Sequence, residues 1–272
     1  MRREGGSAVS AVTYLIRSVR SECAKLSWRN ALWYTIVPAA VLIPILLNYG
    51  IAMAVQTNKF DGAGGMDTDN AAYWIIVFST FILMAGGVSS LCSEFKDTTI
   101  QIVFGIQTRR WLLPVAKLIV FGAIAAFTAW VTTFVILWGF PRLLPDVWGR
   151  VDVFSSEGLR LWFGIPLLTV LVCALGLGLA ALVPKPGFVV MIVLLWKFGV
   201  EVFVNFIPGD VGMLVQRLMP FKNGELGVGQ LATFESLFGG ENGSLLYFGA
   251  LCVVLFVAGV LRLSLTDLKN DN

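Results

Sequence analysis

The sequence predicts an all-α integral membrane protein with six membrane-spanning helices. Of its 272 residues, 57% are apolar and 14% are charged, whereas roughly 25% of the residues in an ordinary soluble domain are charged. A mean hydropathy of +0.81 over this length cannot come from one buried core. Several apolar runs reach about 20 residues, which is enough to cross a bilayer core of about 30 Å.

Residue types that are missing exclude several kinds of chemistry. The chain has no histidine, which excludes Ser-His-Asp and Cys-His catalysis, His-ligated haem and the usual His-rich zinc sites. Four cysteines form no CxxC pair and no readable disulfide framework, so we expect them to pack as small apolar side chains. Residues 1–30 contain no apolar run followed by a cleavage site, so we expect no cleavable signal peptide. We therefore predict no catalytic residue and no metal site.

Residues 1–30 are expected to form a cytoplasmic tail and an amphipathic helix. Five apolar residues follow one another at helical spacing: Val12, Ile16, Val19, Cys23 and Leu26. Four cations lie off this stripe or at its end: Arg17, Arg20, Lys25 and Arg29. This pattern predicts a helix that lies in the cytoplasmic membrane interface, and the alternative is an ordinary basic tail. Trp28, Trp33 and Tyr34 follow where an aromatic belt at the headgroups belongs.

Apolar runs and turn signals place six spans near residues 31–55, 71–92, 114–138, 159–183, 187–206 and 244–263. The fourth and fifth spans are separated only by 184–186, whose two prolines cannot continue a helix and so predict a tight hairpin. Pro38 and Pro44 should kink the first span and free carbonyls that neighbours must satisfy. Small residues at helical spacing, such as Ala174 and Gly178, predict close helix packing.

Lysine and arginine residues indicate the orientation of the spans. With the N-terminus in the cytoplasm, 13 of the 20 cations lie inside, six lie outside and Lys197 lies within a span. Because cytoplasmic loops are enriched in cations, both termini are predicted to be cytoplasmic. Carboxylates run the other way, with ten outside and six inside. The net charge of +3 thus reflects membrane topology and does not indicate a nucleic-acid partner.

The loop between the second and third spans, 94–113, is the most informative segment. Asp97 or Thr98 can cap a short helix, and basic residues stand at its C-terminal end, where cations are favoured. One face of that helix is apolar, with Ile100, Val103 and Phe104. Such a helix docks either on the bilayer or its own bundle, or in a groove of a soluble partner.

Lys197 and Glu201 lie inside the fifth span, four residues apart on one helical face. Opposite charges at this spacing can pair, and burying either one alone in hydrocarbon costs several kcal/mol. They are therefore expected to face protein or water. Three interpretations remain open: a polar element at a permeation path or subunit interface, a self-neutralising pair near a membrane face, and a proton relay.

Between the fifth and sixth spans, 208–243 contains short apolar pieces that are broken by glycines. Each piece is too short to cross the bilayer, which suggests re-entrant or interfacial helices. Three aspartates lie in the first outer loop: Asp61, Asp67 and Asp69. They lack the spacing of an EF-hand, and a solvated loop is favoured over a metal site.

The chain resembles the permease subunits of type 2 (ABC-2) ATP-binding-cassette exporters over nearly its whole length. The resemblance rests on a Lys-Leu element before the first span (Lys25-Leu26), on six spans with both ends inside, and on one loop pattern. That pattern has a glutamate, an aromatic and a basic residue, later a threonine, two arginines and a lysine that opens the third span. Here it comprises Glu94, Phe95, Lys96, Asp97, Thr98, Thr99, Arg109, Arg110 and Lys117. Thr98 and Thr108 depart from the Gly and Pro common in the family, which predicts an altered start of the helix.

Several properties follow from this resemblance. It implies two cytosolic ATP-binding-cassette ATPase subunits as partners, a second permease copy or homologue, and a bacterial inner (plasma) membrane location. The family's loop touches the ATPase, which assigns coupling to Glu94, Phe95, Lys96, Asp97, Thr98, Thr99, Ile100, Val103, Phe104, Arg109 and Arg110. It also implies that 208–243 caps the pathway as an outer gate. Apolar and small residues along the pathway suit export of a hydrophobic or amphipathic cargo such as a drug, peptide or lipid.

The chain lacks a GxxxxGK[ST] phosphate loop, so we expect ATP and magnesium on the partner ATPase and no cofactor here. The main alternative is a secondary carrier driven by an ion gradient, although inverted repeats are not evident. A membrane enzyme would need a catalytic cluster at one depth, and no intramembrane aspartate pair is found. A structural or scaffold subunit is a further alternative.

Overall fold

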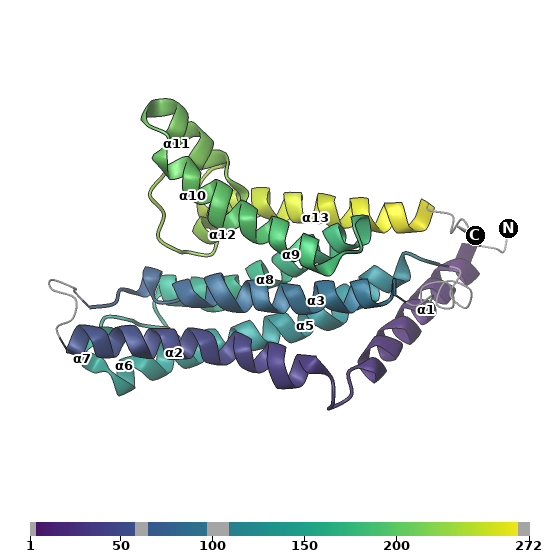
Figure 1. Cartoon of the computed structure of the whole chain (residues 1–272), viewed down its shortest axis with the longest axis horizontal. Helices are drawn as coiled ribbons and strands as arrows, with labels where there is room; N and C mark the ends of the chain where they lie inside the picture. Colours follow the sequence, from purple (N-terminus) through teal and green to yellow (C-terminus); the bar gives the residue numbers. More distant parts are fainter. Residues whose placement is uncertain (1–3, 58–64, 97–108, 266–272) are drawn as a thin grey trace.

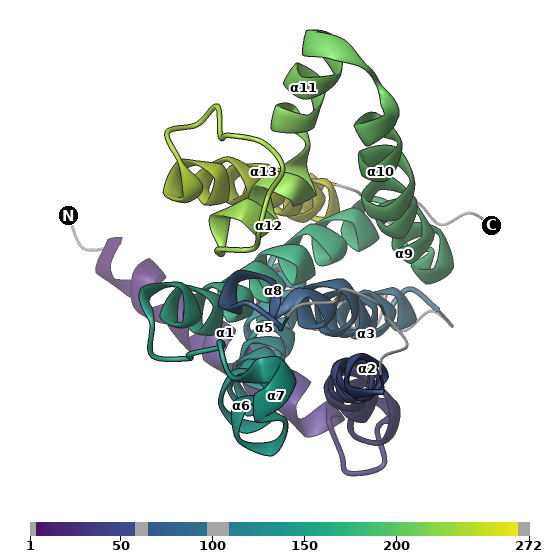
Figure 2. The same ribbon diagram turned by 90° about the vertical axis from the view of Figure 1, so that its left-hand side faces the viewer.

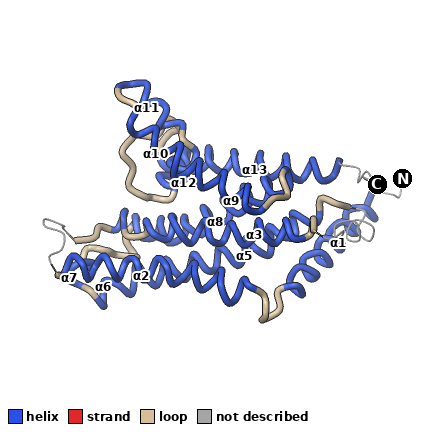
Figure 3. The backbone as a smooth tube through the Cα atoms, in the orientation of Figure 1, coloured by secondary structure: helices blue, strands red, loops and turns tan. Residues whose placement is uncertain are grey.

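The structure is a computed structural model that describes residues 4–57, 65–96 and 109–265. In these ranges all regular structure is helical, without a strand (Figure 3). Six helices are long and apolar enough to cross a membrane: Leu32–Gln56, Thr68–Ser93, Leu112–Leu143, Ser156–Leu182, Pro186–Phe206 and Glu241–Leu265. They match the six predicted spans to within a few residues at each end, and the prediction of a multi-pass, all-α membrane protein is confirmed.

The first three spans contain short π-helical turns that apolar periodicity does not predict. After α1 (Glu4–Lys25), the first span consists of η1 (Leu32–Ile36) and α2 (Val37–Gln56). The second contains the 3-10 turn η2 (Thr68–Asn70), the π-helical turn η3 (Ile75–Ser79) and α3 (Thr80–Ser93). The third contains α5 (Leu112–Phe134), η4 (Val135–Gly139) and α6 (Phe140–Leu143), and α7 (Pro145–Trp148) follows it.

The last three spans include two short helices between the fifth and the sixth span. The fourth span is α8 (Ser156–Leu182), and the fifth consists of α9 (Pro186–Leu194), η5 (Leu195–Val200), α10 (Glu201–Phe203) and η6 (Val204–Phe206). Two short helices follow, α11 (Gly209–Leu218) and α12 (Pro220–Gly227), before the sixth span α13 (Glu241–Leu265). α8 and α9 are joined by the tight connection that the two prolines predict.

The spans run along the long axis of the molecule, which gives it two distinct ends (Figure 1). α1 and the C-terminal end of α13 lie at one end, here called the termini end. α7, α11 and α12 lie at the opposite end, here called the distal end. Consecutive spans therefore cross the molecule in alternating directions, as a six-span chain with both ends on one side requires.

Helix α8 lies at the centre of the bundle, where it packs against α3, α5 and α13 (Figure 2). Gly178 permits a close approach to α13, because a Cβ atom there would lie 2.6 Å from the carbonyl oxygen of Leu255. This agrees with the predicted role of small residues in helix packing. Most residues of the spans that contain α3 and α8 are buried, whereas most residues of those that contain α2, α9 and α13 are partly buried or exposed.

Pro44 in α2 removes a backbone donor, as the sequence predicts, and a neighbouring span replaces it. In a regular helix the N–H of this position bonds the carbonyl four residues earlier, which here belongs to Ala40. The buried hydroxyl of Ser79 donates to Ala40 O at 2.5 Å. The missing hydrogen bond is thus replaced by one between the first and second spans, which ties α2 to the core.

Helix α1 uses two different faces. Ser18 and Glu22 are buried where α1 packs on α5. The apolar stripe points elsewhere, since Val12 is 58% and Ile16 is 48% exposed. The polar side of this amphipathic helix therefore contacts the bundle, and its predicted apolar stripe has little contact with the described part of the chain.

Candidate functional site

Two carboxylates and two ammonium groups form a cluster at the termini end. Three of the four residues are almost fully buried: Glu22 is 4%, Glu94 is 6% and Lys117 is 1% exposed. The fourth, Lys25, keeps 42% of its side chain exposed. We call Glu22, Lys25, Glu94 and Lys117 the charge cluster.

Each ammonium group of the charge cluster contacts both carboxylates. Lys117 Nζ lies 2.6 Å from Glu22 Oε2 and 3.0 Å from Glu94 Oε1. Lys25 Nζ lies 2.7 Å from Glu22 Oε1 and 2.6 Å from Glu94 Oε1. Lys117 also donates to Ser90 Oγ at 3.0 Å. Four formal charges sum to zero, and these contacts offset the cost of burying them.

Three helices bring the charge cluster together. Glu22 and Lys25 lie in the last two turns of α1, and Glu94 directly follows α3. Lys117 lies in the second turn of α5 and reaches back to both carboxylates. The cluster therefore fixes α1 against the two helices that flank 97–108.

Electrostatics favour the charged forms of Glu94 and Lys25, which both lie outside the spans. Burial alone raises the pKa of Glu94, but hydrogen bonds and charge from Lys25 and Lys117 outweigh it and lower the pKa below its ordinary value. Burial alone lowers the pKa of Lys25, and its bonds with both glutamates outweigh this and raise the pKa. Both groups are held ionised at neutral pH.

Both flanks of the predicted coupling loop contact α1. On one side Glu94 binds Lys25, and the side chain of Phe95 packs on the buried core. On the other side the guanidinium carbon of Arg109 lies 5.4 Å from the ring centroid of Tyr14 on α1. Lys96 is exposed and Arg110 is partly buried. The other predicted coupling residues lie outside the described residues: Asp97, Thr98, Thr99, Ile100, Val103 and Phe104.

At the distal end, Lys197 and Glu201 do not pair with each other as their spacing suggests. Both are buried, but Lys197 Nζ lies 2.5 Å from Glu225 Oε1 on α12. Glu201 instead accepts the backbone N–H groups of Phe221 at 2.8 Å and Lys222 at 2.9 Å. The expected pair is therefore replaced by contacts with α12, whose free N–H groups and positive helix end attract a carboxylate.

Side chains of opposite charge hold the two ends of α12. Glu201 from the fifth span caps its N-terminal end, and Arg160 from α8 donates to the Gly227 carbonyl at its C-terminal end at 2.7 Å. Arg160 also donates to Asn242 Oδ1 at 2.8 Å and lies 2.7 Å from Glu241 Oε2 at the start of α13. The fourth, fifth and sixth spans thus meet at this helix, and both caps match its dipole.

Sequence reasoning found some of these residues and missed others. It singled out Glu94, Lys117, Lys197 and Glu201, but not Glu22 as a partner of Lys117, Glu225 as the partner of Lys197, or Arg160 as a cap of α12. Arg160 lies at the outer end of the predicted fourth span and Glu225 in a segment predicted to be outside, so both look like ordinary surface charges. The sequence carries one signal for Glu22. A carboxylate on an interfacial helix needs a partner if its face of the helix packs on a span.

No cofactor site is evident in the described ranges. No group of three or more Cys, Asp or Glu side chains there is placed to hold a metal ion. Asp67 of the first outer loop lies 3.6 Å from Arg150, and both side chains are mostly exposed. Asp61 lies outside the described residues.

Comparisons with protein-family models, curated proteins and solved structures find no match for this chain. The geometry of the two charged regions and the pattern of the sequence therefore carry the functional argument.

Proposed function

We propose that this chain is the membrane-spanning permease subunit of an ATP-driven exporter of the ABC-2 type. In this proposal, a separate ATPase subunit binds at 97–108, and its ATP hydrolysis drives efflux of a hydrophobic or amphipathic substrate. One observation carries the proposal: α1 contacts both flanks of that loop, through the charge cluster on one side and Arg109 on the other.

This arrangement would make α1, α3 and α5 move together when the loop is displaced. A force on Glu94 reaches α1 through Lys25 and α5 through Lys117, because these ion pairs are short and two of the three side chains are buried. Coupling then requires two packings of the bundle whose populations nucleotide changes on the ATPase. The charge cluster is the rigid link between the loop and the spans.

The other parts of the chain take matching roles in this proposal. The termini end is cytoplasmic, and α1 lies in the membrane interface with its exposed apolar stripe toward lipid. A second copy or a homologue packs beside exposed spans, and the pathway lies between the two permeases. α11 and α12 are re-entrant segments of an outer gate, held by Glu201 and Arg160.

A test is to purify the full chain from its native host in mild detergent, identify the proteins bound to it, and measure ATP hydrolysis. The expected result is a stoichiometric ATPase whose hydrolysis continues in Glu94→Gln while export by the intact complex is lost. Arg109→Gln should weaken the same coupling but leave the charge cluster intact. Glu235→Gln, an exposed carboxylate at the distal end, is the matched control and should change neither activity.

Two outcomes would contradict the proposal. A chain that purifies alone and transports in response to an ion gradient is instead a secondary carrier, and Lys197 and Glu201 become its candidate residues. Normal coupling in both loop-flank variants removes the assigned role of the charge cluster, even if an ATPase is bound. Thermal unfolding of each variant separates a loss of coupling from a loss of fold.

A further inference from the structure

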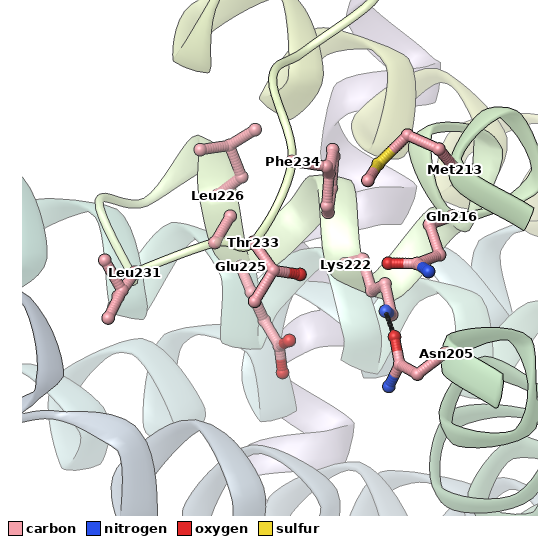
Figure 4. A pocket seen from close by; sticks show the side chains of 10 residues that line it. Asn205, Met213, Gln216, Lys222, Glu225, Leu226, Leu231, Thr233 and Phe234 are labelled. Atoms are coloured by element: carbon pink, nitrogen blue, oxygen red, sulfur yellow. Dashed lines mark hydrogen bonds between the residues drawn. The ribbon is translucent and has the colours of Figure 1, made fainter. Parts of the chain in front are cut away.

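A pocket at the distal end lies between the fifth span, α11, α12 and the segment that follows α12. Its volume is about 500 Å³. Asn205, Gln216, Lys222, Glu225 and Thr233 line it with polar groups, and Met213, Leu226 and Phe234 with apolar ones (Figure 4). We call it the distal pocket.

Several polar groups of the distal pocket are open to a bound solute. Lys222 Nζ donates to Asn205 Oδ1 and has two further N–H groups. Gln216 is 9% exposed, and its side chain has no hydrogen-bond partner in the described part of the chain. Figure 4 shows its amide turned toward Lys222 inside the pocket. The amide is therefore free to bind a solute that enters the pocket.

The carboxylates near Lys222 are already engaged. Glu201 accepts two backbone N–H groups of α12, and Glu225 is bound to Lys197. Lys222 itself forms no salt bridge with any of the described residues. The pocket therefore offers an ammonium group and neighbouring amide N–H groups to an oxyanion.

Two exposed aromatic side chains of the fifth span lie close to Asn205 in the sequence. Phe206, next to Asn205, is 76% exposed, and Phe203 one turn earlier is 74% exposed. An apolar chain attached to the bound oxyanion can lie along these rings. The pocket walls formed by Leu226 and Phe234 suit the first carbon atoms of such a chain.

We infer that the distal pocket binds the anionic headgroup, phosphate or carboxylate, of an amphiphile whose apolar chain lies along the fifth span. Lys222 and Gln216 bind the oxyanion, and Phe203 and Phe206 contact the chain. This inference concerns binding and does not depend on the proposed ATP-driven export.

Equilibrium binding of radiolabelled dodecyl phosphate to the purified full chain in dodecyl maltoside tests the inference. Lys222→Gln should weaken binding about tenfold, the value for one charge-assisted hydrogen bond, and Gln216→Leu about fivefold. Arg150→Gln is the matched control at the same end, because it removes one positive charge from a side chain that is 69% exposed. This control should leave binding unchanged.

Competition experiments distinguish the ligand classes. Dodecyltrimethylammonium should not displace the probe, and inorganic phosphate should do so only at much higher concentration. Equal weakening in Arg150→Gln and Lys222→Gln, or equal displacement by the cationic amphiphile, overturns the anion site. Inorganic phosphate that competes as well as dodecyl phosphate supports the anion site but overturns the amphiphile. If Lys222→Gln unfolds, Gln216→Leu decides, and unchanged binding there overturns the inference.

Discussion

The charge cluster at the termini end and the capped helix α12 at the distal end stabilise charged side chains in two different ways. In the charge cluster, side chains of opposite charge neutralise one another across α1, α3 and α5. At the distal end, Glu201 and Arg160 instead bind backbone groups at the two ends of a short helix. Both regions place charges where the surroundings are mostly apolar.

This difference has consequences for how the two regions respond to change. Removing one member of the charge cluster leaves a buried charge uncompensated, so the cluster acts as a single unit. Removing Glu201 leaves two backbone N–H groups of α12 unpaired, and removing Arg160 leaves one carbonyl unpaired. α12 also lines a pocket that water can enter. We therefore expect a rigid termini end and a distal end whose short helices move more easily.

Lys117→Met should give the largest effect, because it leaves Glu22 and Glu94 with only the half-exposed Lys25. Breaking a buried ion pair by removing one partner costs about 3–5 kcal/mol. The free energy of unfolding in detergent measures the loss. Lys25→Met is the comparison variant and should cost much less, since 42% of its side chain is exposed. Equal losses in the two variants would show that burial does not govern the cluster.

Glu201→Ala should have an intermediate effect that is confined to the distal end. It leaves the N–H groups of Phe221 and Lys222 without their acceptor, which costs about 1–3 kcal/mol. Hydrogen exchange of the α12 amides should accelerate, while exchange in α1 and α5 stays unchanged. Glu235→Ala removes an exposed carboxylate nearby and serves as the control. Acceleration throughout the chain would instead show that the two regions form one cooperative unit.

The pH dependence of stability should separate the charge cluster from the rest of the chain. The lowered pKa of Glu94 means that its contribution is complete above its ordinary value of 4.5 and is lost as the pH falls through the lowered pKa. The raised pKa of Lys25 means the reverse, with a contribution complete below 10.5 and lost as the pH rises through the raised pKa.

The measurement is the thermal unfolding midpoint of the wild type minus that of Glu94→Gln, followed from neutral to acidic pH. This difference should stay constant down to about the ordinary pKa of a glutamate and then shrink. The effect should be smaller than that of Lys117→Met, because a protonated Glu94 keeps its shape and one acceptor oxygen. A constant difference throughout the acidic range would contradict the assigned ion pairs.

Arg109→Gln should give the smallest effect, since it removes only a cation–π contact with Tyr14. Such a contact contributes about 0.5–1 kcal/mol at an exposed site. The unfolding free energy measures this contribution. Arg142→Gln at the distal end is the matched variant and should cost more, because Arg142 both stacks 3.9 Å from the Trp138 ring centroid and donates to the Trp138 carbonyl. Reversal of this order would show a further role for Arg109 in folding.

Much of the fold could be predicted, because spans depend on composition within one segment. Six apolar runs, the proline hairpin at 184–186 and the small residues of α8 are local patterns, and each has a counterpart in the structure. The π-helical turns, such as η5, could not be predicted, since they leave no periodic signal. The partners of Lys197 and Glu201 could not be predicted, because a spacing of four residues describes one helix and carries no information about α12.

The sequence alone determined that this chain has six helices long and apolar enough to cross a membrane, because hydropathy and length are properties of each segment by itself. It also marked Glu94 and Lys117 as charges next to a loop. Only the tertiary structure decided which charges meet, because ion pairs such as that of Lys117 with Glu22 join positions 95 residues apart in sequence. The same holds for α12, whose two caps come from the fourth and fifth spans.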